Sequence, residues 1–274
     1  MHKKISDPPV FVGASGRERR TIIVEKAMYD EMRQQQDSHW WYCARKEIVL
    51  DVAEKIAGLK CSDSCPVILD AGCGMGVILD KLVDYGDTYG MDMDAKAVSY
   101  CRDNYKAENP SAHIKQGSLP ENIPFAEGSF DMIFALDVLE HIEDDNAAVK
   151  AIAKLLKKDG KLILTVPALM SLWSGHDVLN RHFRRYNKKE LVKVIQDAGL
   201  KIIKCSYYDS FLFLPAFMVR KIKNLLKINS SDISMTSKGK VINTILMKIF
   251  AGEKCFLRKH GFPVGVSLIL VAKI

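Results

Sequence analysis

The sequence has no apolar run long enough to span a membrane, and its first residues lack the apolar core of a secretory signal. The longest apolar run, residues 211–219, is interrupted by Pro215 and falls far short of the ~20 residues that a membrane-spanning helix needs. Residues 1–9 carry positive charge but no apolar stretch. These absences argue against a membrane-spanning or secreted protein, and we expect a cytoplasmic one.

The cysteines lack the pairing that a disulfide framework or a zinc site requires. The chain has seven of them, an odd number, at positions 43, 61, 65, 73, 101, 205 and 255. An odd, scattered set is typical of reduced thiols. Cys61 and Cys65 form one CxxxC pair, but no second pair and no nearby histidine accompany it. The sequence therefore predicts neither disulfides nor a metal site.

The composition excludes disordered, collagen-like and coiled-coil classes and is typical of a globular protein. The 274 residues are 48% hydrophobic and 27% charged, which supplies enough apolar side chain for a sizeable core. The formal net charge of +7 is unevenly spread, because residues 220–260 alone carry ten basic and two acidic side chains. The basic excess thus belongs to one segment rather than to the whole surface.

Alternating β-rich and helical patterns predict a doubly wound α/β fold. We expect strands at residues 67–69, 88–91, 113–115, 130–136, 161–166, 201–208 and 264–272. We expect helices at residues 28–57, 77–85, 95–105, 146–156 and 189–198. Strands that alternate with helices of ~10–15 residues indicate a mostly parallel sheet with helices on both faces.

Residues 209–262 are too long for a simple connection between the last two strands. They contain further helical patterns at 211–228 and 241–250. We therefore expect a flexible N-terminal segment (1–27), a main domain (28–208 and 263–274) and a basic helical insertion (209–262). A basic amphipathic helix suits either an anionic membrane surface or packing against the domain. Nucleic acid is disfavoured because the segment lacks interleaved aromatic residues.

A glycine-rich loop directly follows the first expected strand. Its residues are Asp70, Ala71, Gly72, Cys73, Gly74, Met75 and Gly76. Glycines let the backbone turn tightly beside a ligand, and the N–H groups of the following helix face that ligand. A dinucleotide fingerprint would need glycine where the chain has Val77, and Asp70 would repel a pyrophosphate. Asp92 ends the next strand, where a carboxylate can accept hydrogen bonds from both ribose hydroxyls. The pattern favours an adenosine nucleoside that carries an amino-acid tail and no phosphates.

With these residues the sequence resembles the class I S-adenosylmethionine-dependent methyltransferases, specifically the bacterial type-11 group. The matching pieces are residues 67–76, 90–92, 128–133, 137–142 and 155–162. The resemblance implies a seven-stranded Rossmann-like methyltransferase fold whose last strand is antiparallel. It also implies methyl transfer from S-adenosylmethionine to a small-molecule, glycan or lipid-linked acceptor, which gives S-adenosylhomocysteine. The chain departs from the family in having Ser118 where aspartate is common, and Lys158, Asp159 and Gly160 where the usual turn is Pro-Gly-Gly.

The resemblance also implies roles for individual residues in holding the cofactor. It places Gly72, Gly74 and Gly76 along the methionine part, Asp92 at the ribose and Met93 at the adenine face. It places Ser118 and Leu119 at the adenine edge, and Leu136 and Asp137 near the methionine amine and the sulfonium. Asp70 and Cys73 of the same loop are also expected to bind the cofactor. Trp41 and Arg45 lie on the helix that the family folds over the cofactor. Either Trp40 or Trp41 could shield the sulfonium, and the other would belong to the core.

Three histidines are candidates for the acceptor side. His141, just after the fourth strand, faces the transferred methyl or merely caps its loop. His176 and His182 lie in a loop after the fifth strand that is rich in Trp, His and Arg and predicts an acceptor-binding lid. Either could serve as the base. Arg184 or Arg185 could bind an anionic acceptor, or both could pair with Asp177 and with acids of the preceding helix.

Three alternative functions remain at this point. A nicotinamide dehydrogenase is disfavoured by Val77 and by the pattern of the last strand. A non-catalytic S-adenosylmethionine-binding module is disfavoured by the crowded lid. An RNA methyltransferase is disfavoured because no added RNA-binding domain is visible. If the basic insertion contacts lipid, the protein would be peripheral to the inner face of the membrane.

Overall fold

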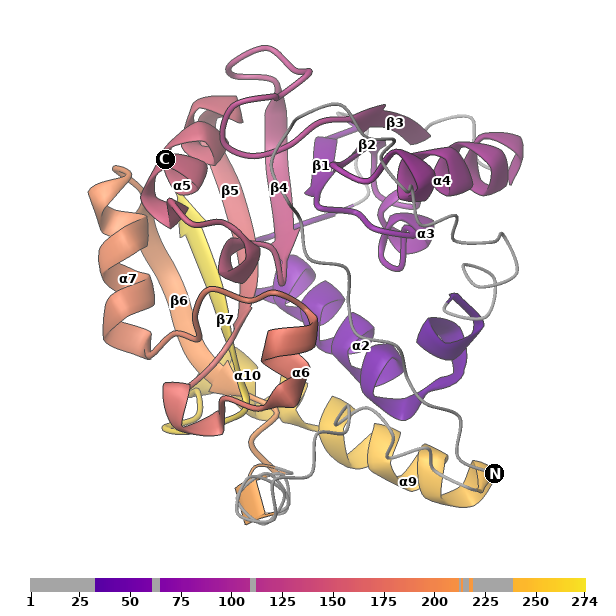
Figure 1. The fold of residues 1–274 in the computed structure, drawn as a ribbon, viewed down its shortest axis with the longest axis vertical. Coiled ribbons are helices and arrows are strands. Elements are labelled where there is room, and N and C mark those ends of the chain that lie inside the picture. The colour runs from indigo at the N-terminus through magenta and orange to yellow at the C-terminus, as the bar shows by residue number, and fades with distance from the viewer. Residues whose placement is uncertain (1–32, 61–64, 109–111, 212, 214–216, 219–238) are drawn as a thin grey trace, which may run out of the picture.

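The computed structural model describes residues 33–60, 65–108, 112–211, 213, 217–218 and 239–274. Seven strands form one mixed sheet in the order β3-β2-β1-β4-β5-β7-β6 (Figure 1). The strands are β1 (Val67–Ala71), β2 (Asp87–Asp92), β3 (Ala112–Gln116), β4 (Phe130–Leu136), β5 (Leu156–Pro167), β6 (Lys201–Tyr208) and β7 (Ser267–Lys273). β7 runs antiparallel to both β5 and β6, whereas β1 to β5 pair in parallel. The predicted doubly wound fold with an antiparallel last strand is confirmed.

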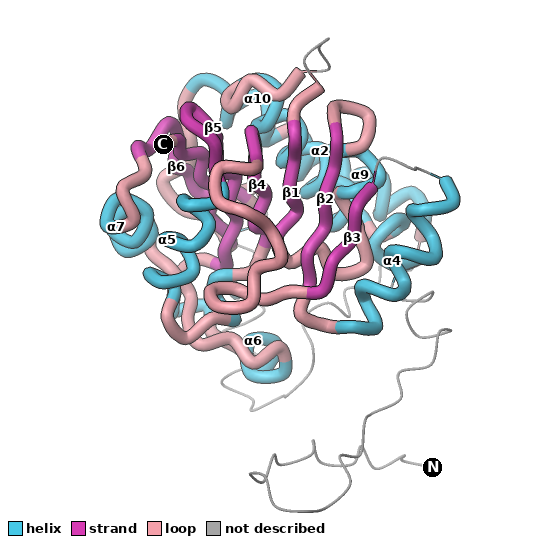
Figure 2. Tube along the Cα trace, turned by 90° about the horizontal axis from the view of Figure 1, so that it is seen from above, coloured by secondary structure: helices cyan, strands magenta, loops and turns pink. Residues whose placement is uncertain are grey.

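Helices cover both faces of this sheet (Figure 2). They are α2 (Trp40–Lys55), α3 (Leu79–Leu82), α4 (Ala95–Glu108), α5 (Asp145–Leu155), α6 (Gly175–Leu179), α7 (Lys188–Asp197), α9 (Lys240–Ala251) and α10 (Glu253–Lys259). Residues of α5 and α7 pack in one apolar cluster with the sheet, and residues of α2, α9 and α10 pack in another. These are the two larger clusters of the core, and residues of α3 and α4 pack in a smaller one that includes Leu79 and Val98.

The strands alternate their side chains between these two clusters. Leu69 and Ile133 belong to the cluster of α5 and α7, whereas their neighbours Ile68 and Phe134 belong to the cluster of α2. This alternation follows from the two-residue period of a strand. Because both faces are buried, central strands such as β4 and β7 read as nearly continuous apolar runs rather than as apolar-polar alternation.

Local sequence signals mark both ends of α7. Asn187 caps α7 in a capping box with Glu190, and Gly199, with φ +85°, follows the helix end. The expected helix 146–156 gives way to β5 at Leu156. The register of β5 then shifts, because Phe130 pairs with Leu156 and Met132 with Lys161. A bulge over residues 157–160 therefore lies where a Pro-Gly-Gly turn was the expected alternative, with Asp159 at φ +65°.

The described part of the expected insertion lies against the main domain. Phe250 of α9 and Leu257 of α10 pack in the same cluster as Ile48 of α2. Two basic side chains of α10 also pair with acids of α2: Lys254 Nζ lies 2.8 Å from Glu47 Oε2, and Arg258 Nε lies 2.9 Å from Asp51 Oδ2. Part of the basic excess is thus neutralised by α2.

Two predicted segments fall mainly or wholly outside the described residues. They are the N-terminal segment 1–27 and most of the expected helix 211–228. The division into domains remains a proposal. Among the helices that the structure describes, none has the length and apolar character needed to cross a membrane.

Candidate active site

The glycine loop after β1 turns back against β2. The N–H groups of Gly72 and Cys73 both donate to the carbonyl of Met91, at 2.7 and 3.0 Å. Gly72 has φ +82°, and a Cβ there would lie 2.4 Å from Cγ2 of Val138. Gly74 has φ +51°, yet no heavy atom lies within 4 Å of where its Cβ would be. The loop is therefore packed tightly at Gly72 and open at Gly74.

Asp92, at the end of β2, is fixed to this loop by its carboxylate. The N–H of Gly74 donates to Oδ2 at 2.8 Å, and the N–H of Asp94 donates to Oδ1 at 2.9 Å. An ionised carboxylate has about four acceptor positions, so each oxygen can still accept another hydrogen bond. Next to it, Met93 is 74% exposed and presents an apolar surface. Ser118 and Leu119 follow β3 on the neighbouring turn, where Ser118 and Asn122 exchange backbone hydrogen bonds.

We call the glycine loop after β1 together with Asp92 the cradle. Asp70, at the end of β1, is buried beside it. Its exposed fraction is 3%. Burial and the charge of Asp92 raise the pKa of Asp70 to about 7, although the Arg45 guanidinium acts in the opposite direction. Asp70 is therefore a group whose ionisation responds to any new charge brought to the cradle.

Arg45 of α2 connects the helix to the carboxyl ends of β4 and β5. Its Nη2 lies 2.8 Å from Oδ2 of Asp137 and also donates to Oγ1 of Thr165 at 2.8 Å. Asp137 has φ +58°, and Thr165 donates to its Oδ1 at 2.9 Å. Burial alone would lower the pKa of Arg45, but Asp137 and Tyr208 raise it above its ordinary value. Asp137 is thus held in place by a charged, hydrogen-bonded network.

The two tryptophans of α2 have different surroundings. Trp40 is buried in the core and meets Phe250 edge to face. Trp41 is half-buried, and the Arg45 guanidinium lies 5.3 Å from its ring centroid. Its Nε1–H donates to Asp209 Oδ2 at 3.1 Å. Trp40 is therefore the core residue of the pair, and Trp41 lies on the side of the Arg45 network.

In the expected lid, a buried carboxylate orients one histidine. Nδ1 of His182 and Nε of Arg185 lie 2.9 and 2.7 Å from Oδ1 of Asp177, which is fully buried. Burial alone would raise the pKa of Asp177, but hydrogen bonds from His182 and Arg185 hold it well below its usual range. Asp177 is therefore ionised and can only accept, so Nδ1 of His182 carries the proton. In the neutral ring, Nε2 then has a free lone pair.

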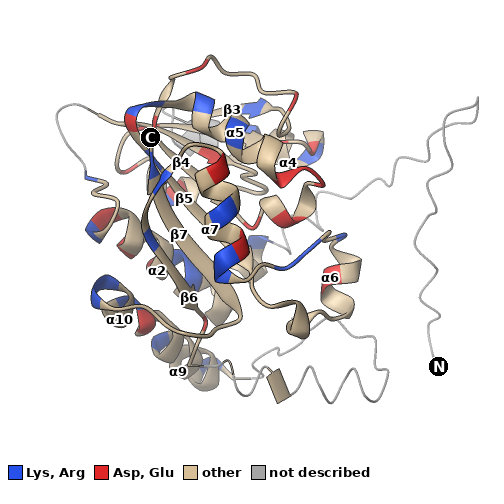
Figure 3. Ribbon diagram, turned by 90° about the vertical axis from the view of Figure 1, so that its left-hand side faces the viewer, with Lys and Arg blue, Asp and Glu red and all other residues tan. Residues whose placement is uncertain are grey.

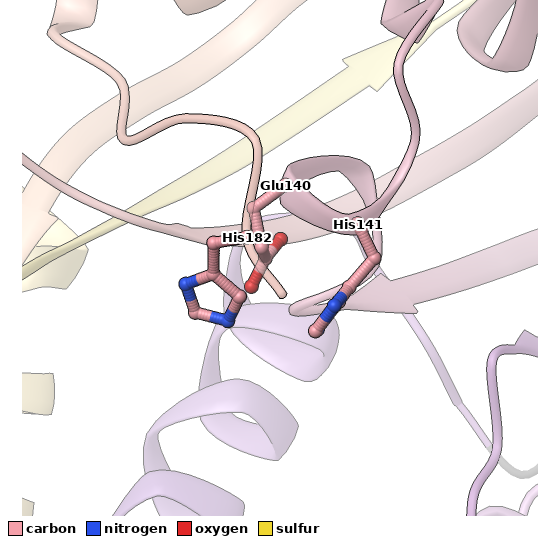
Figure 4. A group of neighbouring side chains, drawn as sticks. All are labelled: Glu140, His141 and His182. Carbon is pink, nitrogen blue, oxygen red and sulfur yellow. The ribbon is translucent and has the colours of Figure 1, made fainter. Parts of the chain in front are cut away.

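His182 shares a small space with Glu140 and His141, which lie in the 3-10 turn Leu139–His141 after β4 (Figure 4). One ligand atom from each of the three residues lies within 4.8 Å of the other two. The rings of His141 and His182 are 4.7 Å apart and nearly perpendicular. The N–H of Phe183 donates to the Glu140 carbonyl at 2.7 Å, which fastens the lid to this turn.

The pKa values of Glu140 and His141 are both shifted from their ordinary values. Glu140 is 1% exposed, and burial together with the charge of Asp137 raises its pKa well above its usual range. Desolvation and the charge of His182 lower the pKa of His141, whereas Asp137 and Asp92 act in the opposite direction. His141 is therefore within electrostatic reach of the carboxylates at the ends of β2 and β4.

The lid arginines are engaged in ion pairs. Arg184 Nη1 lies 2.8 Å from Asp145 Oδ2 in α5, and Arg185 is buried against Asp177. The structure thus shows the pairing alternative rather than free anion-binding groups. His176 lies next to Asn180, and its ring centroid is 6.2 Å from that of His182, outside the group of three. In Figure 3 the basic part of this loop lies beside α6.

Two residues of this region were not among those that the sequence predicted. Glu140 directly precedes His141, so an acid beside a candidate histidine was the available signal. Asp177 was expected only as a partner for arginine, and its contact with His182 depends on how the lid folds.

Comparisons with known proteins identify relatives of this chain. Residues 69–164 match the type-11 methyltransferase family model, whose description is "Methyltransferase domain". The chain is 27% identical over 169 residues to a "Probable S-adenosylmethionine-dependent methyltransferase" of Mycolicibacterium smegmatis. The matched region covers 61% of each protein. It is 27% identical over 173 residues to the "Ubiquinone biosynthesis O-methyltransferase" of Thiobacillus denitrificans, which covers 62% of this chain and 65% of that protein. These matches thus span less than two thirds of each relative.

The fold is also shared with solved structures. Phosphoethanolamine N-methyltransferase 2 of Haemonchus contortus, in complex with S-adenosyl-L-methionine, superposes with a TM-score of 0.55 at 14% identity. The superposition covers 82% of this chain and 51% of that one. At this identity the likeness shows the fold.

Proposed function

We propose that this chain, which carries a class I S-adenosylmethionine-dependent methyltransferase domain, transfers a methyl group from S-adenosylmethionine to a small-molecule acceptor. The observation that carries the proposal is the cradle at the carboxyl ends of β1 and β2. There, the N–H of Gly74 holds the carboxylate of Asp92 beside the open side of the glycine loop. Ligands of doubly wound sheets bind at such strand ends.

The residues of the cradle fit the parts of this cofactor. Asp92 has acceptor positions left for two ribose hydroxyls, and the exposed Met93 offers an apolar face to adenine, with Ser118 and Leu119 at the adenine edge. The backbone of Gly72, Cys73, Gly74 and Gly76 lines the methionine part. Leu136 and Asp137 lie at the end of β4, where the amine and the sulfonium belong. The carboxylates of Asp70 and Asp137 suit this cationic end of the cofactor.

The residues of the chain supply alignment and exclusion of water, because the cofactor carries its own leaving group. When bound, S-adenosylmethionine supplies an electrophilic methyl carbon, whose bond to sulfur breaks as the acceptor's electron pair attacks. In this proposal Trp41 and Arg45, which lie together on α2, would cover the site from one side, and the lid, which is bonded to the turn after β4 through the N–H of Phe183, would cover it from another. This arrangement favours an in-line reaction in a desolvated space.

On the acceptor side we place His141 and His182. Asp177 fixes the tautomer of His182, so that Nε2 carries the free lone pair on a ring that lies beside Glu140 and His141 (Figure 4). Nε2 of His182 can therefore receive a proton from the methyl acceptor, or bind a ligand that removes this proton. His176 is less well placed, because it lies outside this group.

We further propose that the methyl acceptor is a glycan or a lipid-linked molecule. Support comes from α9, whose Val241, Ile242 and Ile245 are 72%, 56% and 51% exposed on a helix that also carries Lys240 and Lys248. An apolar face flanked by lysines suits the surface of an anionic membrane. This helix would bring the site close to a lipid-borne acceptor.

The test is transfer of radiolabelled methyl groups to fractionated cell extracts. Full-length protein is incubated with labelled S-adenosylmethionine and with separate pools of small metabolites, lipids, glycans and RNA. We expect label in the small-molecule, lipid or glycan pools. Label in RNA alone would support an RNA methyltransferase, and label in none of the pools would support a non-catalytic binding module.

A further inference from the structure

We infer that Glu140, His141 and His182 form a binding site for one divalent transition-metal ion of the Zn²⁺ or Mn²⁺ class. The chemical role of this ion rests on the proposed methyl transfer. The binding site itself rests on the geometry below, and it goes against the expectation from the cysteine pattern, which pointed to no metal site.

The three side chains converge from two separate segments. Glu140 and His141 come from the turn after β4, and His182 comes from the lid (Figure 4). Their ligand atoms already lie within 4.8 Å of one another. Ligands that bind one ion at ~2.0–2.2 Å lie at most about 4 Å apart, so the site must contract by only about 1 Å. His141 is exposed and has room to make this adjustment.

The donor set itself indicates the class of ion. Two imidazoles and one carboxylate are a common ligand set for divalent transition metals, and they leave coordination positions open for water or substrate. A set of oxygen atoms alone would favour Mg²⁺ or Ca²⁺ instead. The nitrogen donors therefore favour Zn²⁺ or Mn²⁺ over Mg²⁺.

An unpaired carboxylate oxygen is the independent sign of a cation. Glu140 is 1% exposed, and within the part of the chain that the structure describes its Oε2 has no hydrogen-bond partner. Buried carboxyl oxygens usually have a hydrogen-bond partner, because a buried polar atom left without one costs about 1–3 kcal/mol. A metal ion between Glu140 and the two histidines would supply the missing partner.

Asp177 supplies the support that a metal-bound histidine usually has. Ligating histidines commonly donate their second ring N–H to a carboxylate, which fixes the ring and strengthens the ligand. Asp177 accepts from Nδ1 of His182 at 2.9 Å and is itself held by Arg185 and the N–H of Ser174. Nε2 is thereby left as the ligand atom. Asp177 is a positioning residue for this site.

A metal-free alternative explains less of the geometry. The pair of Asp177 and His182 could act as a simple base, and this would account for the orientation of His182. It would leave Oε2 of Glu140 buried without a partner. The metal site accounts for both observations.

The position next to Asp137 indicates what the ion would do. A divalent ion lowers the pKa of a bound hydroxyl, so an acceptor O–H would lose its proton to solvent. The oxygen's electron pair would then form the bond to the methyl carbon, and the pair of the carbon–sulfur bond would stay on sulfur. The acceptor class that this site fits is therefore an oxygen nucleophile, such as an alcohol or a phenol.

The test measures metal binding directly, without turnover. Metal-depleted, full-length protein is titrated with Zn²⁺ against a chromogenic chelator, and Mn²⁺ binding is followed by electron paramagnetic resonance. We expect one equivalent to bind, with affinity at least tenfold lower in Glu140→Gln, in His141→Asn and in His182→Asn. Asp177→Asn should weaken binding by about 10–100-fold, the usual cost of losing such a support. His176→Asn, in the same lid, is the matched control and should bind as the wild type does.

Absence of binding by the wild-type protein, or equal binding by all variants, would overturn the inference. His141→Asn alters an exposed side chain, so it tests the site even if the buried variants fold poorly. S-adenosylmethionine is titrated in parallel to separate the two proposals. Cofactor binding without metal binding removes only the metal site. Metal binding without cofactor binding removes the methyl-transfer proposal and leaves the site in place.

Discussion

At the scale of single residues, the candidate site is a set of carboxylates whose charges are controlled by their contacts. Asp92 accepts two backbone N–H groups, Asp137 is paired with Arg45, and Asp177 is paired with His182 and Arg185. Asp70 is buried without a comparable ion pair among the described contacts. In the proposed function these acids therefore act differently. Asp92 contacts the ribose, Asp137 lies at the cationic end of the cofactor, and Asp177 orients His182.

Asp92→Asn tests the ribose contact. The substitution keeps the size of the side chain but removes its charge and replaces one acceptor oxygen with an NH2 donor. Hydrogen bonds to a charged group contribute about 1.5–3 kcal/mol, so the Kd for S-adenosylmethionine should rise about 10–100-fold in calorimetry. Asp87→Asn, at the opposite end of the same strand, is the control and should bind as the wild type does. Equal affinities of the two variants would contradict the assignment.

Asp70 should make the stability of the ligand-free protein depend on pH. Its pKa is about 7 in the folded state and about 3.9 in the unfolded state, so between these values the folded state holds a proton that the unfolded state has released. This contribution to stability is therefore lost as pH rises, at up to about 1.4 kcal/mol per pH unit. Asp70→Asn has no such proton. The difference between the free energy of unfolding of the variant and that of the wild type should therefore shift in favour of the variant as the pH rises from 5 to 7. Parallel curves in chemical denaturation would contradict this.

At the scale of elements, most strands and helices could be predicted because their signals are local. The strand at residues 201–208 has the predicted limits, and Asn187 and Gly199 mark the ends of α7. α10 was not predicted, because few apolar positions mark it in the sequence. Its Leu257 is buried through packing in the same cluster as α2, which the local sequence does not show. The burial of Glu140 could not be predicted locally either, because the lid that contacts its turn, through the N–H of Phe183, comes from far along the chain.

Phe250→Ala tests whether α9 belongs to the main core. Phe250 is fully buried, stacks on Tyr208 and meets Trp40 edge to face. Replacing such a side chain by alanine costs about 3–5 kcal/mol, so the whole protein should unfold earlier in one transition. Ile249→Ala, at a 43% exposed position of the same helix, should cost about 1 kcal/mol or less. A separate early transition confined to α9 and α10 would show an independent subdomain.

At the scale of the whole molecule, the order of the strands assembles the site. β2, β1 and β4 are neighbours in the sheet, so Asp92, Asp70 and Asp137 at or just after their carboxyl ends lie along one edge. This convergence could be predicted from sequence, because parallel strands place their carboxyl ends together. In the lid, the ion pair of Arg185 with Asp177 was among the alternatives that the sequence left open. The contact of Asp177 with His182 could not be predicted, because it depends on the path of an irregular loop.

The exposed apolar side of α9 predicts contact with anionic membranes. The double variant Ile242→Asp/Ile245→Asp should lose at least about tenfold in affinity for anionic vesicles, equivalent to about 1.4 kcal/mol. Val178→Asp, an exposed apolar position on α6, is the control and should sediment with vesicles as the wild type does. If wild-type protein fails to sediment with anionic vesicles, the membrane proposal is wrong and the acceptor is to be sought among dissolved metabolites.

The most direct test of the account is calorimetric titration of the purified full-length protein with S-adenosylmethionine and, separately, with NAD. The account predicts one equivalent of S-adenosylmethionine bound, a weaker fit in Asp92→Asn, and no heat of binding from NAD. Binding of NAD, or no binding of S-adenosylmethionine at millimolar concentration, would contradict it.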